Sequence, residues 1–167
     1  TKKFFPKKNV YITGNPVRLK YIGLTKNEAE KTLGIQTNRP IIFISGGSQG
    51  AQKINKVILE SLDKLLEKYF VIWSTGAANY QSVKHRMSNK IKIAPFLDEK
   101  ELAAAYILCD VAIGRAGAGT IFEIAAFGKP SILIPLERSG GDQPHNAQAY
   151  VEANATIVLK ESDLNTE

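Results

Sequence analysis

Short apolar runs alternate with amphipathic stretches along nearly the whole chain of 167 residues. The clearest run is Pro40 to Ser45 (PIIFIS), in which apolar residues follow one another without alternating with polar ones. A continuous run is typical of a strand buried on both faces, as strands of parallel sheets are. The next stretch, Ala51 to Tyr69, repeats its apolar residues with the period of an α-helix. Repeated strand–helix units predict an α/β fold, with a mostly parallel sheet and helices on both faces.

The same alternation continues on both sides of this unit. Thr25 and Glu28 form a capping box, which predicts a helix start, and Gly34 predicts its end. The other predicted strands are 9–13, 70–73, 90–95, 110–113, 131–135 and 156–159. The other predicted helices are 79–87, 98–108, 120–127 and 146–153, and Ser162 is expected to begin a further one.

The composition supports a folded domain and narrows its partners. Hydrophobic residues make up 44% of the chain and charged residues 23%, which is enough for a packed core. The net charge of +6 suits a phosphorylated ligand, an anionic lipid or nucleic acid. Basic and aromatic residues do not interleave as they do in single-strand binders, so we expect no nucleic acid partner. The single cysteine, Cys109, has apolar neighbours and is expected to be a buried thiol.

Two glycine-rich segments, each between a predicted strand and a predicted helix, are the first candidates for a binding site. They are Gly46 to Gly50 (GGSQG) and Gly114 to Thr120 (GRAGAGT). Ligands of parallel sheets bind beyond the carboxyl ends of the strands, and helix N-termini offer N–H groups to phosphate. The first segment is neither a Walker A loop nor a GxGxxG fingerprint. Each could also be a tight turn without a ligand.

Several polar or aromatic side chains near these segments could contact a nucleotide. The Thr120 hydroxyl could reach an anion, and the Glu123 carboxylate could accept hydrogen bonds from a ribose diol. The alternative is that Thr120 and Glu123 form a capping box. The polar loop Ser139 to Asn146 could hold a sugar or be an exposed connector. Phe96 and Leu97 could line a base pocket or belong to the core.

The sequence shows no acid–base couple, no nucleophile motif and no metal-binding set. The two histidines, His85 and His145, lie in none of the known catalytic or zinc patterns. We therefore expect a cradle for a phosphorylated ligand that needs no metal or cofactor and contains no catalytic group of its own.

Four motifs, taken together in order and spacing, resemble one family. They are Gly14 to Arg18 (GNPVR), Gly46 to Ala51 (GGSQGA) with Asn55, Arg115 to Thr120 (RAGAGT) with Glu123, and Asp142 to Ala147 (DQPHNA). Over about residues 9–164 the chain resembles the C-terminal domain of the MurG family, the bacterial undecaprenyl-diphospho-muramoylpentapeptide N-acetylglucosaminyltransferases. This resemblance implies the GT-B architecture, in which two Rossmann-like domains face each other across a cleft. It implies a sheet of about six strands here and UDP-N-acetylglucosamine as the ligand.

The resemblance also implies a role for each matching position. Gly47 and Ser48 would contact the diphosphate, and Arg18 would lie near the phosphates or the interdomain cleft. The other implied substrate contacts are Phe96 and Leu97 at uracil, the turn with Arg115, Ala118, Gly119 and Thr120 at phosphate, Glu123 at the ribose, and Asp142, Gln143 and Asn146 at the sugar. Asp142 departs from the family's pattern, whereas Gln143 matches it.

The resemblance covers one half of such a transferase. It implies that residues 1–8 are a remnant of the interdomain linker and that residues 9–167 are the donor-binding domain. The catalytic base and the lipid acceptor site would belong to an N-terminal domain, so this chain is expected to bind UDP or the UDP-sugar without catalysing transfer. The whole enzyme would be peripheral, on the cytoplasmic face of the bacterial inner membrane. The alternatives are the donor domain of a diacylglycerol glycosyltransferase, or a stand-alone binding subunit that recruits a membrane partner.

Overall fold

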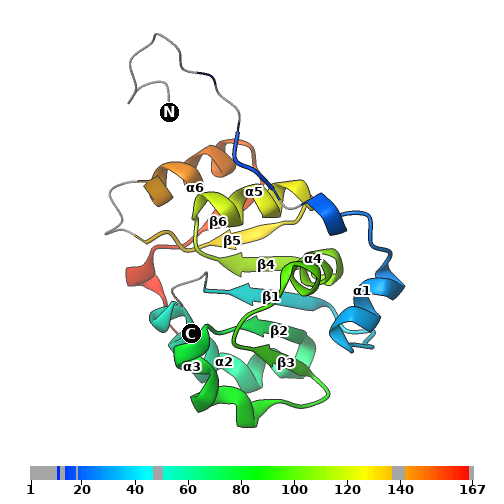
Figure 1. The fold of residues 1–167 in the computed structure, drawn as a ribbon. Coiled ribbons are helices and arrows are strands. Elements are labelled where there is room, and N and C mark those ends of the chain that lie inside the picture. Colours follow the sequence, from blue (N-terminus) through cyan, green and yellow to red (C-terminus); the bar gives the residue numbers. More distant parts are fainter. Residues whose placement is uncertain (1–10, 12–13, 18, 47–50, 137–141, 166–167) are drawn as a thin grey trace.

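The fold is built on a sheet of six parallel strands with the order β3-β2-β1-β4-β5-β6. The computed structural model describes residues 11, 14–17, 19–46, 51–136 and 142–165. The strands are β1 (Ile41–Ser45), β2 (Phe70–Ser74), β3 (Ile91–Ala94), β4 (Val111–Gly114), β5 (Ser131–Leu133) and β6 (Thr156–Val158), and Figure 1 shows helices layered on the sheet. All five neighbouring pairs of strands are parallel, as the alternation in the sequence predicts.

Several helices begin or end at local signals in the sequence. They are α1 (Lys26–Leu33), α2 (Gln52–Lys68), α3 (Ala77–Val83), α4 (Glu99–Leu108), α5 (Ala118–Ala126) and α6 (Asp142–Glu152), with single 3-10 turns η1 (Leu19–Tyr21), η2 (Lys84–Arg86) and η3 (Glu161–Asp163). The capping box of Thr25 and Glu28 starts α1, and Gly34 ends it in the left-handed conformation, φ 64°. Asp98 and Glu101 form a second capping box at the start of α4. These caps satisfy N–H groups that the first turn leaves without partners.

Four predicted elements differ in the structure, and one of them, the helix expected to begin at Ser162, is only the 3-10 turn η3. The predicted helix 79–87 is the shorter α3 followed by η2. Of the predicted strand 9–13 only Tyr11 is described; it is not in a strand and is 86% exposed. Helix α6 begins at Asp142 rather than Asn146. Pro144 lies in the first turn of α6, where a helix makes no use of the missing N–H, so the proline does not mark a loop.

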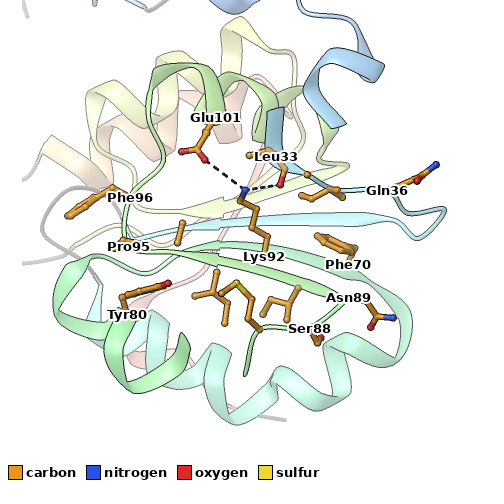
Figure 2. A pocket seen from close by; sticks show the side chains of 16 residues that line it. Leu33, Gln36, Phe70, Tyr80, Ser88, Asn89, Lys92, Pro95, Phe96 and Glu101 are labelled. Carbon is orange, nitrogen blue, oxygen red and sulfur yellow. Dashed lines mark hydrogen bonds and ion pairs between the residues drawn. The ribbon is translucent and has the colours of Figure 1, made fainter. Parts of the chain in front are cut away.

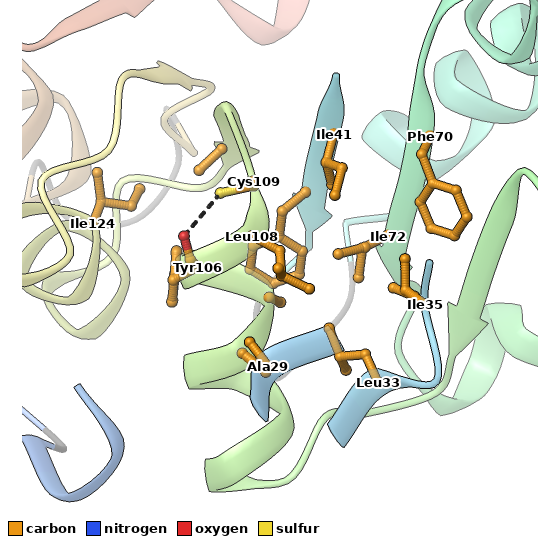
Figure 3. Packing of buried hydrophobic residues seen from close by; sticks show 14 of the residues in the cluster. Ala29, Leu33, Ile35, Ile41, Phe70, Ile72, Tyr106, Leu108, Cys109 and Ile124 are labelled. Atoms are coloured by element: carbon orange, nitrogen blue, oxygen red, sulfur yellow. Dashed lines mark hydrogen bonds between the residues drawn. The ribbon is translucent and has the colours of Figure 1, made fainter. Parts of the chain in front are cut away.

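The two faces of the sheet carry separate cores because successive strand residues point to opposite sides. In β1, Ile41 and Phe43 join one cluster with residues of α1, α4, α5 and α6, part of which Figure 3 shows. Ile44 joins the other cluster, together with residues of α2 and α3. The central strand is therefore buried on both faces, as its continuous apolar run predicts.

The first core cluster contains an aromatic stack beside the cysteine. Tyr106 packs edge-on against Phe43 at 5.1 Å between ring centroids and stacks on Phe127 at 5.3 Å. Burial raises the pKa of the Tyr106 phenol, and the nearby charge of Glu123 adds to the effect. Cys109 is 1% exposed, which confirms the predicted buried thiol, and burial raises its pKa to about 12.

Candidate functional site

The order of the strands creates a topological switch point between β1 and β4. The chain runs outward from β1 through β2 to β3 and then returns to place β4 on the other side of β1. Ser45, the last residue of β1, is the register partner of Gly114, the last residue of β4. Chains that leave such neighbouring strands in opposite directions open a crevice at their carboxyl ends. Both glycine-rich segments of the sequence therefore begin side by side at this switch point.

Gly114 lets the two strand ends approach closely. A Cβ atom at this position would lie 2.7 Å from the carbonyl oxygen of Ser45, which is closer than real Cβ atoms come. It would also lie 3.8 Å from the Cγ2 atom of Thr120. The side chain of Thr120 is thus at the β1–β4 junction.

The N-terminus of α5 lies at the same edge of the sheet. Gly117 is the N-cap and makes no side-chain capping bond, and Ala118, Gly119 and Thr120 form the first turn. Because Thr120 is the third residue inside the helix, the alternative that it caps the helix with Glu123 is wrong. N–H groups in a first turn have no partner within the helix, so these three can serve an anion. Glu123 lies almost one turn further along and is half-buried.

A buried polar network supports the neighbouring strand end. Asn55 of α2 is 4% exposed, and its amide donates to the carbonyl oxygen of Thr75 at 2.8 Å. The indole N–H of Trp73 donates to the side-chain oxygen of Asn55 at 3.0 Å. Asn79 donates to the same Thr75 carbonyl at 3.3 Å. The network joins the first turns of α2, which follow the Gly46–Gly50 segment, to the carboxyl end of β2.

This structural role of Asn55 does not emerge from the sequence, where the residue stands out only as part of a motif. The signal that could reveal it is one amide among the buried positions of an otherwise apolar helix face, since Ile54, Ile58 and Leu62 are the other buried residues of α2. A buried amide at such a position needs partners from another element.

Arg115 follows β4 and is held on two sides. Its Nη1 atom donates to the carbonyl oxygen of Ile134 at 3.2 Å, and its Nη2 atom forms an ion pair with Glu161 of η3. The side chains of Arg115 and Glu161 are 13% and 22% exposed. The guanidinium therefore lies at the edge where the resemblance implies a phosphate, and it is already neutralised by a carboxylate.

Helix α6 contributes three of the expected sugar contacts. Asp142 and Gln143, which were expected in a loop, lie in the helix, and Asn146, which was expected to begin the helix, lies one turn inside it. Gln143 accepts a hydrogen bond from the backbone N–H of Leu136 at 2.9 Å. Asn146 donates to the carbonyl oxygen of Ala116, in the β4–α5 turn, at 3.0 Å. These bonds fix the start of α6 against the candidate site.

A groove of about 750 Å³ runs along the exposed edge of β3 rather than across the switch point. Figure 2 shows Phe96 at one end of this groove and Asn89 toward the other. Within it, Lys92 donates to the carbonyl oxygen of Leu33 at 2.7 Å and lies 3.8 Å from a carboxylate oxygen of Glu101. Only the end of the groove at Phe96 reaches the carboxyl ends of the strands, where the ligands of parallel sheets bind. The switch point remains the stronger candidate because the N-terminus of α5 lies there and both glycine-rich segments begin there.

Residues 41–167 match the model of the glycosyltransferase family 28 C-terminal domain. The chain belongs to this family. It is 36% identical over 163 residues to the UDP-N-acetylglucosamine--N-acetylmuramyl-(pentapeptide) pyrophosphoryl-undecaprenol N-acetylglucosamine transferase of Chlorobium limicola, and 38% identical over 170 residues to the protein of the same name from Flavobacterium psychrophilum.

These alignments cover 95% and 99% of this family 28 domain but only 43% and 46% of the relatives. The chain thus spans less than half the length of the curated relatives it matches. The crystal structure of Acinetobacter baumannii MurG has the same fold, with a TM-score of 0.70 and 24% identity, over 97% of this chain and 47% of that one. The comparisons confirm the resemblance read from the motifs.

The structure describes only some of the expected site residues, and not all of these lie at the switch point. Arg18, Gly47 and Ser48 lie outside the described residues. Those that gather around the switch point are Arg115, Ala118, Gly119, Thr120, Gln143 and Asn146, by the contacts and helix positions given above. Phe96 is 54% exposed, so the alternative that it belongs to the core is wrong, while Leu97 is partly buried against the first core cluster.

Among the residues that the structure describes, no group of three or more His, Cys, Asp or Glu residues could hold a metal ion. No helix of the described part is both long and apolar enough to span a membrane.

Proposed function

We propose that this chain is the donor-binding domain of a glycosyltransferase, and that it binds UDP-N-acetylglucosamine at the β1–β4 switch point. The observation that carries the proposal is the register of Ser45 with Gly114, since the two glycine-rich segments begin at these strand ends, beside the N-terminus of α5. The names of the relatives in Chlorobium and Flavobacterium supply the sugar donor and the acceptor. The reaction is transfer of N-acetylglucosamine to the undecaprenyl-diphospho-muramoylpentapeptide lipid for peptidoglycan.

The diphosphate is assigned to the first turn of α5 and to the segment after β1. Backbone N–H groups of Ala118, Gly119 and Thr120 would donate to it, together with Gly47 and Ser48. During transfer the bond between the sugar C1 atom and the diphosphate oxygen breaks, and negative charge builds on the departing UDP. N–H groups fixed at a helix end stabilise that charge without reorganising. The base that activates the acceptor hydroxyl would come from another domain.

The nucleoside and the sugar are assigned to residues on either side of that turn. Glu123 would accept hydrogen bonds from the two ribose hydroxyls, and Phe96 with Leu97 would border the uracil. The sugar would contact the start of α6, where Gln143, Asp142 and Asn146 lie. Arg18 is assigned to the phosphates or the cleft between domains.

This assignment implies a division of labour within a longer protein. Residues 1–8 would be a linker remnant and residues 9–167 the donor domain, which binds UDP or the UDP-sugar but does not catalyse transfer alone. The lipid acceptor would be bound by an N-terminal domain, so that the whole protein works at the cytoplasmic face of the bacterial inner membrane. No cofactor is assigned.

The proposal is tested by calorimetry of UDP and UDP-N-acetylglucosamine binding to the chain and to Glu123→Ala. A carboxylate that accepts two hydrogen bonds contributes on the order of 1.5–3 kcal/mol, so we expect both ligands to bind about 10- to 100-fold more weakly. Glu60→Ala is the matched control, because Glu60 is an exposed acid of α2 whose ion-pair partner is Lys56. Unchanged binding by Glu123→Ala would remove Glu123 from the site, and no binding by the unsubstituted chain would refute the proposal.

The same assay separates the proposed donor from related ones. UDP-glucose and UDP-galactose are compared with UDP-N-acetylglucosamine. A clear preference for the N-acetyl sugar supports the proposed reaction. Equal or tighter binding of the simple hexoses would point to a diacylglycerol glycosyltransferase instead.

A further inference from the structure

The guanidinium of Arg115 has two partners, and they belong to different parts of the fold. The Nη1 atom of Arg115 is bonded to the carbonyl oxygen of Ile134, which is 3% exposed and directly follows β5. The carboxylate that meets Nη2 belongs to Glu161, at the start of the single turn η3. One side of the guanidinium is therefore anchored to the core, and the other to a short segment after the last strand.

The segment that carries Glu161 crosses from one half of the sheet toward the other. It leaves β6, and Leu164 packs against the second core cluster, which includes Ile44 and Trp73 of the central strands. A segment on this path passes the end of the sheet at which Arg115 and the candidate diphosphate site lie.

The pair leaves little positive charge for an anionic ligand. Arg115 and Glu161 are both largely buried and sum to zero charge, so a diphosphate arriving beside Arg115 meets the carboxylate as well. A buried guanidinium without any counter-ion would be costly, which explains why Arg115 is paired with Glu161. A diphosphate can take over this function, because a guanidinium binds phosphate and carboxylate oxygens with the same geometry.

We propose that Glu161 is the resident counter-ion of Arg115 and that the diphosphate of a bound nucleotide takes its place. This inference rests on the proposed function. The bond to Ile134 keeps the guanidinium in position during the exchange, and η3 is released from the site when the nucleotide binds. Glu161 thus lowers the affinity for the diphosphate part of the ligand and couples donor binding to the segment after β6.

The test compares UDP with uridine, because only UDP carries the group that competes with Glu161. In Glu161→Gln we expect UDP to bind about 3- to 10-fold more tightly, as removal of one nearby negative charge allows, with uridine binding unchanged. Asp163→Asn is the matched control, since it removes the same charge from the same turn, where Asp163 accepts a hydrogen bond from Ser162. Its ratio of UDP to uridine affinity should stay within about twofold of the original.

A second measurement needs no substitution and holds even if Glu161→Gln folds poorly. NMR titration of the unsubstituted chain should shift the backbone amide signals of Ser162 and Asp163 with UDP and not with uridine. An unchanged or lower UDP-to-uridine ratio in a folded Glu161→Gln, or amide signals that ignore UDP while it binds, would overturn this inference alone. Failure of UDP to bind the unsubstituted chain would overturn both the inference and the proposed function.

Discussion

Replacing Asn55 by alanine should destabilise the domain through the network it shares with Trp73 and Thr75. The substitution removes the hydrogen bond to the Thr75 carbonyl and the acceptor of the Trp73 indole, at 2.8 Å and 3.0 Å. The carbonyl keeps its bond from Asn79, at 3.3 Å, whereas the indole N–H, on a side chain with 0% exposure, loses its acceptor. A buried orphaned donor costs about 1–3 kcal/mol and a lost hydrogen bond about 0.5–1.5 kcal/mol. We therefore expect a loss of about 3 kcal/mol, or roughly 6–12 °C in Tm.

A double-mutant cycle with Trp73→Phe isolates the contribution of the indole. Trp73→Phe removes the donor, so Asn55→Ala should cost about 1–2 kcal/mol less in that background than in the original chain. Urea unfolding followed by far-UV circular dichroism is suitable for all variants, because Trp73 is the only tryptophan and its fluorescence is lost on substitution. Asn79→Ala, which removes only the longer bond to the same carbonyl, is the control and should cost less than about 1 kcal/mol. Equal costs of Asn55→Ala in both backgrounds would refute the reasoning.

Two further predictions concern the strand end and the cysteine. Gly114→Ala should destabilise the domain by about 2–4 kcal/mol, because the added Cβ would lie 2.7 Å from the Ser45 carbonyl oxygen. Gly119→Ala is the control: its added Cβ has no neighbour within 4 Å, so the change should be neutral or stabilising by up to about 1 kcal/mol. Equal unfolding midpoints in urea would contradict this difference. Because folding raises the pKa of Cys109 from 9.0 to about 12, its thiol should react with iodoacetamide at pH 8 roughly 1,000-fold more slowly in the folded chain than in urea. Fast labelling of the native chain would contradict this prediction, because it would show that the thiol is accessible. The contribution of this pKa shift to the free energy of unfolding is complete below pH 9 and is lost as the pH rises toward 12.

The order of strands and helices could be predicted from the sequence because each is set by local patterns. The run before Ser45 and the helical period after Ala51 are visible within one window of residues, and so is the capping box at Thr25. The structure confirms each of them. The start of α6 at Asp142 was missed for an equally local reason, because Pro144 and the glycines before it favour a loop unless the helix is known to begin there.

The contacts that define the candidate site could not be predicted, because they join residues far apart in the sequence. Arg115 and Glu161 are separated by 46 positions, and Asn146 and Ala116 by 30. Neither pairing leaves a periodic trace. The sequence also does not state on which side of β1 the strand β4 is added. Only the observed order of strands makes the two glycine-rich segments neighbours.

The position of an acid near an anion site follows from the geometry of α5. Thr120 and Glu123 are three residues apart, which is a rise of about 4.5 Å along a helix axis. The positive end of a helix dipole stabilises a carboxylate within its first turns as well as a phosphate beyond its end. Under the proposed assignment the carboxylate stays far enough back from the diphosphate to limit repulsion and close enough for the adjacent ribose to reach it. The ligand then spans both groups, so the affinity for uridine alone should report Glu123 and the additional affinity for UDP should report the helix end and Arg115.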